Sequence, residues 1–396
     1  MVNGAEERKY LKNITSKQKP PYLLEIQKDA YEWFFREGLR ELFDEINPVK
    51  DIIGRDFELY FLDYSLDEPK FDESTARFKN LTYETSLKVR CKLINKKTGE
   101  IKEQDVYLGD FPVMTENGTF IINGIERVVV SQLVRSPGVF FTTEVIRGRK
   151  YYGAKIIPNR GAWLEISTDQ HNVIWVKIDR KRKVAVTSLL QAFGLDIPEI
   201  KEKFKDVDND PDINYIETTL KKDLARTQEE ALIEVYKRIR PGDLATADNA
   251  KSLIFATFFN FERYDFSRVG RYKINNKFGF TYPNTPENRV LKIEDLIAII
   301  SEIISLNISQ DEADDIDHLS NRRVRAVGEL LQARLRVGLA RMRRIIKDKM
   351  STLNVDSITP VQLINSRPIT SVIREFFMSS IISIYGSSQS SCRVRE

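Results

Sequence analysis

Cysteine and histidine are scarce in this sequence, which contains only Cys91, Cys392, His171 and His318. Two cysteines cannot build a disulfide framework, and the spacing of these four residues does not match a zinc site. Two histidines also leave no readable Ser-His-Asp set. These shortages exclude several classes of enzyme and fit a protein of a reducing, cytosolic compartment.

Long apolar runs and glycine-rich phosphate loops are missing as well. The N-terminal stretch MVNGAEERKYLKN has no apolar core for a signal peptide, and no run reaches the length of a membrane span. Asn123-Gly124 and the Arg-Gly-Arg at 147–149 lack the glycine spacing and the following helix of a Walker loop. We therefore expect a soluble protein that is not exported.

An excess of charge of one sign is also missing, because 62 Lys and Arg face 58 Asp and Glu, a net charge of +4. A whole-chain charge argument for nucleic-acid binding is therefore weak. Locally, however, residues 322–349 contain ten basic and two acidic residues, a net charge of +8. We expect one long helix with a basic face, capped by Asn321 and with Val324 on its buried side. A solvated helix surface is the alternative.

The sequence does have patterned apolar content: 41% of its residues are apolar and 10% aromatic, enough for two or three domains. Residues 20–46 place apolar side chains at helical spacing and predict one or two amphipathic helices with a buried stripe. Residues 55–111 and 151–183 alternate apolar and polar residues, which predicts antiparallel sheets. From Thr187 the spacing becomes helical, including an apolar helix at 292–307. The predicted fold class is α+β, with mixed helices and antiparallel sheets.

Residues 113–141 combine turn signals, apolar strands and a polar loop. Two Asn-Gly dipeptides flank the apolar TFII, and Asn-Gly suits the positive backbone angles of a tight hairpin turn. Val128–Val130 then predicts a buried strand, and the following SQLVRSPG predicts a loop that presents Gln132 and Arg135 outward. On these residues alone, a purely structural loop is the commoner interpretation.

The string MTENGTFIINGIERVVVSQLVRSPGVFF resembles the N-terminal region of the β subunit of bacterial-type or plastid DNA-directed RNA polymerase. Further motifs follow in the order of that family: IIPNRGAWLE (156–165), IDRKRK (178–183), VGRYKIN (269–275), DDIDHLSNRRVRAVGELLQ (314–332) and LINSRPITSVIREFF (363–377). The resemblance covers nearly the whole chain and implies a lobe domain inserted into a discontinuous protrusion domain. The implied ranges are 1–141 and 314–377 for the protrusion, 142–313 for the lobe, and 378–396 for a divergent or truncated tail.

Catalytic and metal-binding residues are not expected in this chain. Nucleotide addition needs clustered carboxylates that hold two Mg²⁺ ions, and the one candidate is the acidic run Asp311–Asp317. Because negative charge stabilises a helix N-terminus, a structural role in front of the basic helix is the better interpretation of this run. The resemblance implies that another subunit holds the magnesium, so this chain has no cofactor of its own and is inactive alone.

Candidate DNA contacts come from residue chemistry and from the resemblance. Arginine carries a planar guanidinium group suited to phosphates or guanine edges, and tryptophan offers a ring face to an unpaired base. On this chemistry the candidates are Arg135, Arg322, Arg325 and Trp163. The resemblance implies that the nontemplate strand is held near the start site by Arg135, Trp163, Ile316, Asp317 and Arg322. Two alternatives stay open: Trp163 as a core residue, and Asp317 as an ion-pair partner of Arg322 or Arg323.

The resemblance also implies a partial antibiotic site. Arg127, Val130 and Gln132 match the part of the family's rifamycin pocket that this strand contributes. The match ends after Phe377, where the family continues GSSQLSQFMDQNNP and this chain reads MSSIISIYGSSQSSCRVRE. We interpret the tail from Met378 as a truncation artefact, a frame change or an expression scar, with a divergent split subunit as the alternative. Its serine-rich end is not expected to pack.

These observations lead to a functional expectation. The chain would be part of DNA-directed RNA polymerase, a nucleotidyltransferase complex, in which it lines the DNA channel and contacts the nontemplate strand during transcription. The implied partners are DNA, the β′, α and σ subunits and transcription factors, without a membrane. The implied location is the bacterial cytoplasm and nucleoid, or the plastid stroma. The alternatives are a protein-docking module for transcription regulators without useful DNA affinity, and a non-functional truncated product.

Overall fold

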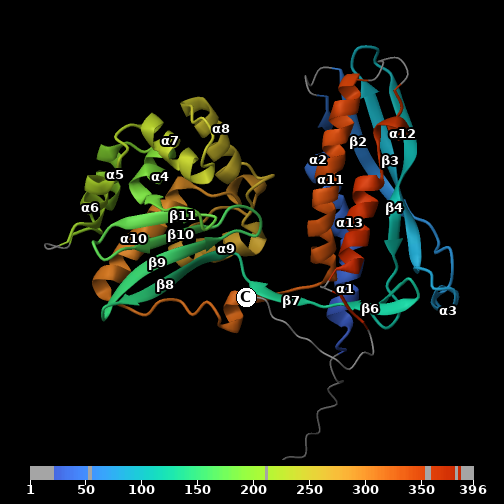
Figure 1. The fold of residues 1–396 in the computed structure, drawn as a ribbon, viewed down its shortest axis with the longest axis horizontal. Helices are drawn as coiled ribbons and strands as arrows, with labels where there is room; N and C mark the ends of the chain where they lie inside the picture. The colour runs from blue at the N-terminus through green and yellow to red at the C-terminus, as the bar shows by residue number, and fades with distance from the viewer. Residues whose placement is uncertain (1–21, 52–55, 210–212, 353–357, 380–381, 385–396) are drawn as a thin grey trace, which may run out of the picture. The chain divides into compact units, whose positions relative to one another are not determined.

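The computed structural model describes residues 22–51, 56–209, 213–352, 358–379 and 382–384. The chain divides into two compact units (Figure 1). The first unit comprises Met1–Gln132 and Arg325–Glu396, and the second unit comprises Leu133–Val324. Within the described residues, no helix is both long enough and apolar enough to cross a membrane. Most of the predicted tail, including its serine-rich end, lies outside the described residues.

The first unit combines helices with two sheets. Its larger sheet is antiparallel with the strand order β1-β2-β3-β4, and a smaller one has the order β14-β6-β5. The strands are β1 (Val49–Lys50), β2 (Phe57–Leu66), β3 (Glu84–Asn95), β4 (Ile101–Pro112), β5 (Phe120–Ile122), β6 (Ile125–Val129) and β14 (Ile382–Ile384). The helices are α1 (Glu25–Trp33), a π-helical turn (Phe34–Gly38), α2 (Leu39–Ile46), α3 (Glu73–Phe78), α11 (Val327–Thr352), α12 (Pro360–Leu363) and α13 (Arg367–Met378).

Alternation along β3 decides which face of the larger sheet is buried. Leu87, Val89, Cys91 and Leu93 are buried, whereas the basic residues between them are exposed or half-buried. Successive side chains of a strand point to opposite faces, so one face of the sheet belongs to the core and the other faces water. The helices α11 and α13, side by side in Figure 1, contribute the other side of this core together with α2.

The predicted hairpin at Asn123-Gly124 is confirmed. The strands β5 and β6 pair with Ile122 opposite Ile125, and both turn residues have a positive φ, 50° for Asn123 and 77° for Gly124. A Cβ atom on Gly124 would lie only 2.7 Å from the Cα atom of Asn80. Glycine is therefore required both by the turn and by the close approach of a neighbouring segment.

The second unit has a five-stranded antiparallel sheet in the order β12-β11-β10-β9-β8, with helices packed on it (Figure 1). The strands are β8 (Gly138–Ile146), β9 (Arg149–Ile157), β10 (Leu164–Thr168), β11 (Ile174–Ile178) and β12 (Val184–Ala185). The helices are α4 (Val186–Ala192), α5 (Ile197–Phe204), α6 (Tyr215–Lys222), α7 (Gln228–Ile239), α8 (Ala247–Phe258), α9 (Ser267–Phe278), α10 (Ile293–Ser309) and two 3₁₀ turns (Pro286–Asn288 and Leu319–Asn321).

A buried ion pair joins α9 to the start of α10. The side chains of Arg271 and Asp295 are both 0% exposed, and two guanidinium N–H groups donate to the carboxylate at 2.8 and 2.9 Å. Arg271 also donates to the carbonyl oxygen of Val290 at 2.6 Å, and Asp295 accepts the backbone N–H of Lys292 at 3.1 Å. Both charges are therefore compensated inside the core.

The predicted α+β class with antiparallel sheets is confirmed, but some local predictions are wrong. The basic segment does not lie on one helix, because Arg322–Arg325 form the strand β13 and α11 begins only at Val327. Asn321 therefore ends a 3₁₀ turn instead of capping α11, and Val324 is 52% exposed. The N-terminal apolar stripe is buried at Phe34, Leu39 and Phe43, whereas Ile26 is 62% exposed. The assignment of the named protrusion and lobe domains stays a prediction.

Candidate nucleic-acid interface

The predicted loop at 131–138 is wrong in part, because residues 132–135 form the strand β7 (Gln132–Arg135), which pairs with β13 (Arg322–Arg325). In the second unit, Arg322 donates from Nη2 to the carbonyl oxygen of Leu133 at 3.3 Å. The backbone N–H of Ser136 donates to the carbonyl oxygen of Asn321 at 2.9 Å. These bonds bring the half-buried Arg135 and Arg322 into one neighbourhood, although about 190 residues separate them in the sequence.

The segment before β13 carries the predicted acidic contact. The backbone N–H of Asp317 donates to Oδ1 of Asp315 at 3.0 Å, and the side-chain amide of Asn321 donates to the carbonyl oxygen of Asp315 at 2.7 Å. This turn leaves the Asp317 side chain exposed and Ile316 half-buried. A carboxylate held at the surface by its own backbone can accept hydrogen bonds from a ligand.

The acidic run as a whole has a different structural role from the predicted one. Asp314 accepts the backbone N–H of Phe141 at 2.8 Å and forms an ion pair with Lys277, so it ties the run to β8 and α9. It does not stand at the N-terminus of α11, because β13 lies between them. Within the described residues, no group of three His, Cys, Asp or Glu side chains is arranged to hold a metal ion.

Trp163 is half-buried, between the two predicted extremes of a core residue and a free platform. Its backbone N–H donates to Oδ1 of Asp179 at 2.8 Å, and the backbone N–H of Asp179 donates back to the Trp163 carbonyl oxygen at 2.9 Å. The guanidinium carbon of Arg180 lies 5.4 Å from the centre of the indole ring, within cation–π range. Asp179 and Arg180 lie in the IDRKRK motif, but no signal in the sequence alone assigns them to the site.

A further bond links β13 to the segment that carries Trp163. Arg323 donates from Nη2 to Oδ1 of Asn159 at 3.0 Å, and Asn159 lies four residues before Trp163. Apart from the end residues Gln132 and Arg325, both strands of the neighbourhood and this segment belong to the second unit. Four of the predicted residues, Arg135, Ile316, Asp317 and Arg322, are thus gathered on adjoining segments, and Trp163 follows on a segment tied to them.

Lys273 on α9 belongs to the same neighbourhood and was missed. Its Nζ atom donates to the carbonyl oxygen of Ser320 at 3.0 Å and lies 5.9 Å from the ring centre of Phe140. Partial burial, with a smaller contribution from the nearby positive charge of Lys277, lowers the pKa of Lys273. The VGRYKIN motif contains this lysine, but its spacing alone did not reveal which segment it would contact.

Arg325 falls into the first unit, and its Nε atom lies 3.9 Å from Glu329 on α11. The basic residues from Arg334 to Lys349 lie along α11 and are partly neutralised. Arg336 makes a two-pronged ion pair with Glu45 at 2.8 and 2.9 Å, while Arg341 and Arg344 are exposed. The helix therefore presents a smaller basic face than its residue count predicted.

The three residues predicted for a partial antibiotic pocket lie along β6 and β7. Arg127 donates from Nη1 to the carbonyl oxygen of Phe377 at 3.1 Å, Val130 is 51% exposed and Gln132 is half-buried. Beyond Phe377 the chain returns as β14, which pairs with β6 at residues 127–129. The bond to Phe377 gives Arg127 a structural role, and its part in binding an antibiotic stays a prediction.

Comparison with known proteins supports the motif-based interpretation. Residues 135–325 match the family described as RNA polymerase Rpb2, domain 2. The chain is 48% identical over 364 residues to the DNA-directed RNA polymerase subunit beta of Syntrophomonas wolfei subsp. wolfei, which covers 92% of this chain and 32% of that protein. It is 46% identical over 407 aligned positions to the subunit of the same name from Chloroflexus aggregans, covering 95% of this chain and 33% of that protein.

The chain thus spans about a third of the length of these curated relatives. The matched domain runs from the end of β7 to the end of β13, so it coincides closely with the second unit, whereas the relatives align with most of both units. The predicted similarity is therefore confirmed: over most of its length the chain is similar to a part of these β subunits of DNA-directed RNA polymerase, and residues 135–325 match the model of RNA polymerase Rpb2, domain 2.

Proposed function

We propose that this chain works as part of a DNA-directed RNA polymerase, where it lines the DNA channel and contacts the nontemplate strand during transcription. Its partners would be DNA and the other polymerase subunits, and the Mg²⁺ used in nucleotide addition would be held by another subunit. The observation that carries the proposal is the grouping of Arg135, Asp317 and Arg322 on adjoining segments of the second unit.

Each of these residues has a distinct task in the proposed contact. The guanidinium groups of Arg135 and Arg322 would bind phosphate oxygens and fix the position of the strand. The exposed Asp317 carboxylate would accept hydrogen bonds from the edge of an unstacked guanine. Trp163, already covered by Arg180 on one side, would stack a neighbouring base on the ring surface that remains accessible.

The test measures binding of a fluorescein-labelled, single-stranded promoter-bubble oligonucleotide by fluorescence anisotropy at two salt concentrations. Base stacking on an aromatic ring contributes about 1–3 kcal/mol, so Trp163→Ala should weaken binding by roughly five- to 150-fold. The matched control is Trp175→Ala, because Trp175 is a half-buried tryptophan of the same unit whose indole N–H is bonded to Asp169 at 2.8 Å. Equal losses for both variants would contradict a specific role for Trp163.

Salt dependence tests the phosphate contacts separately. For a single strand, each phosphate contact contributes about 0.7 to the slope of log K against log salt. We expect Arg135→Gln and Arg322→Gln each to reduce this slope by about that amount. Tight binding that does not change with salt would count against the proposal.

A docking surface for a protein regulator is the second candidate function. It is favoured by exposed apolar side chains in the same neighbourhood, where Leu133 is 45% and Leu319 is 73% exposed. If the oligonucleotide does not bind at low salt, and if Leu319→Ser abolishes the docking of a polymerase regulator, this second function is the correct one.

A further inference from the structure

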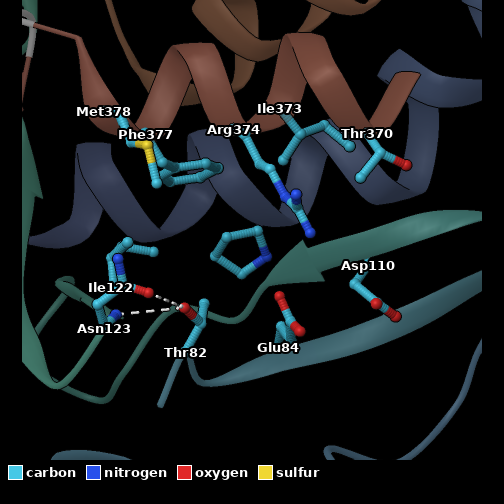
Figure 2. Close-up of a pocket in the computed structure, with 11 residues that line it drawn as sticks. Thr82, Glu84, Asp110, Ile122, Asn123, Thr370, Ile373, Arg374, Phe377 and Met378 are labelled. Carbon is cyan, nitrogen blue, oxygen red and sulfur yellow. Dashed lines mark hydrogen bonds between the residues drawn. The ribbon is translucent and has the colours of Figure 1, made fainter. Parts of the chain in front are cut away.

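The first unit contains a pocket of about 320 Å³ between α13 and the strand ends of β3, β4 and β5 (Figure 2). This volume lies at the lower end of the range for small-molecule sites. The pocket is distinct from the candidate nucleic-acid interface, which lies in the second unit.

Two opposite charges face each other across this pocket. Figure 2 shows Arg374 reaching down from α13 and Glu84 reaching up from the start of β3. Neither side chain makes a hydrogen bond or an ion pair with another residue of the described chain. They nevertheless influence each other electrostatically, since the Arg374 charge is one of the causes that act on Glu84.

The second carboxylate of the pocket is already engaged. Asp110 accepts a hydrogen bond from the hydroxyl of Ser86 at 2.6 Å and forms an ion pair with Lys70 at 3.3 Å. Burial, followed by the negative charge of Asp110, raises the pKa of Glu84, and Lys70 and Arg374 only partly offset this. A half-buried carboxylate in this situation gains from a cation placed beside it.

The remaining lining is mainly apolar on one side and polar on the other. Ile122, Ile373 and Phe377 supply the apolar surface. Thr82 lies on the opposite wall, where its hydroxyl accepts the backbone N–H of Asn123 at 3.2 Å, so that this wall is held in place. An occupant that fits the carboxylate of Glu84, the guanidinium group of Arg374 and the apolar wall carries a cation, an anion and a compact apolar group.

We propose that this pocket binds a small zwitterion of the α-amino-acid class with an apolar side chain. The ligand carboxylate would accept two parallel hydrogen bonds from Arg374, the geometry that a guanidinium group provides. Its ammonium group would donate to Glu84, and its side chain would pack on Ile373 and Phe377. A ligand without the ammonium group would leave the half-buried Glu84 without a partner, and a ligand without the carboxylate would lose the paired hydrogen bonds of Arg374.

Isothermal titration calorimetry of the full 396-residue chain with three related probes tests this proposal. L-leucine carries both charges, L-leucinamide lacks the carboxylate, and 4-methylpentanoate lacks the ammonium group. We expect leucine to bind at least about tenfold more tightly than either singly charged probe, a difference of about 1.4 kcal/mol. Equal affinity of the three probes, or no binding of leucine at millimolar concentration, would overturn the proposal.

Substitutions show whether the binding occurs in this pocket. Arg374→Gln should remove the advantage of leucine over leucinamide, and Glu84→Gln should remove its advantage over 4-methylpentanoate. The control is Glu375→Gln, because the neighbouring Glu375 is exposed and lies 3.8 Å from Arg334, outside the pocket lining. Circular dichroism establishes that each variant is folded. If the control weakens binding as much as the pocket variants do, the ligand binds elsewhere and the assignment is wrong.

Discussion

The buried pair of Arg271 and Asp295 gives a quantitative prediction for the stability of the second unit. Removal of one partner leaves the other charge in a core where both side chains are 0% exposed. Breaking a buried ion pair in this way costs about 3–5 kcal/mol. We therefore expect Asp295→Leu and Arg271→Met each to lower the free energy of unfolding of the second unit by that amount.

The double variant separates the charge effect from packing. Arg271→Met with Asp295→Leu removes both charges and fills much of their volume, so the large cost of an unpaired charge disappears. A smaller cost remains, because the Val290 carbonyl and the Lys292 N–H lose their partners, each worth about 1–3 kcal/mol. We expect the double variant to be clearly more stable than the sum of the two single effects predicts.

Urea denaturation followed by tryptophan fluorescence measures these values in one unit at a time. Trp163 and Trp175 lie in the second unit and Trp33 lies in the first, so a Trp33→Phe background makes the signal specific for the second unit. Single variants that each cost less than about 1 kcal/mol would refute the reasoning. The same holds for a double variant whose cost equals the sum, since additivity means that the two groups do not interact.

Three further predictions concern the first unit. Burial raises the pKa of the Cys91 thiol to about 12, so little reactive thiolate forms in the native protein. In a Cys392→Ser background, a thiol reagent such as DTNB should react with Cys91 only after denaturation. Rapid reaction of the native protein would contradict this. An alanine in the positive φ region costs about 1–2 kcal/mol at both Gly124 and Gly99, and only the Cβ atom at Gly124 also meets a close neighbour. Gly124→Ala should therefore lower the melting temperature more than Gly99→Ala; equal melting temperatures would show that the clash is relieved. Burial raises the pKa of Tyr31 far above its ordinary value of 10.0, so the unfolded chain releases this proton first and stability falls as pH rises above about 10; Tyr31→Phe should reduce that fall in urea melts.

Local patterns predicted those parts of the fold that depend on neighbouring residues. The Asn123-Gly124 turn followed from its dipeptide, because two adjacent residues supply the positive φ angles that the turn needs. The alternation of apolar and basic residues in β3 likewise reports its buried face directly. Such signals need no knowledge of distant segments.

Long-range pairing explains the failures. Arg322–Arg325 have no pattern that separates a strand from a helix start, and their conformation depends on β7, which lies about 190 residues earlier. The candidate site shows the same limit: motif resemblance selected Arg135 and Arg322, but only the folded chain reveals that Arg322 bonds the backbone at Leu133. The roles of Asp179 beside Trp163 and of Lys273 beside Ser320 also depend on contacts between distant segments.

The second unit begins and ends at two strands that pair with each other, β7 and β13, and this has a consequence for the order of folding. To form the first unit alone, the chain must bring residues 132 and 325 together across roughly 190 residues, a loop whose closure costs about 4–5 kcal/mol in chain entropy. If the second unit folds first, its own pairing of β7 with β13 has already closed that loop. Once folded, residues 133–324 hold the two parts of the first unit together as a short hairpin turn would. Replacement of these residues by a two-residue turn should therefore leave the first unit able to fold.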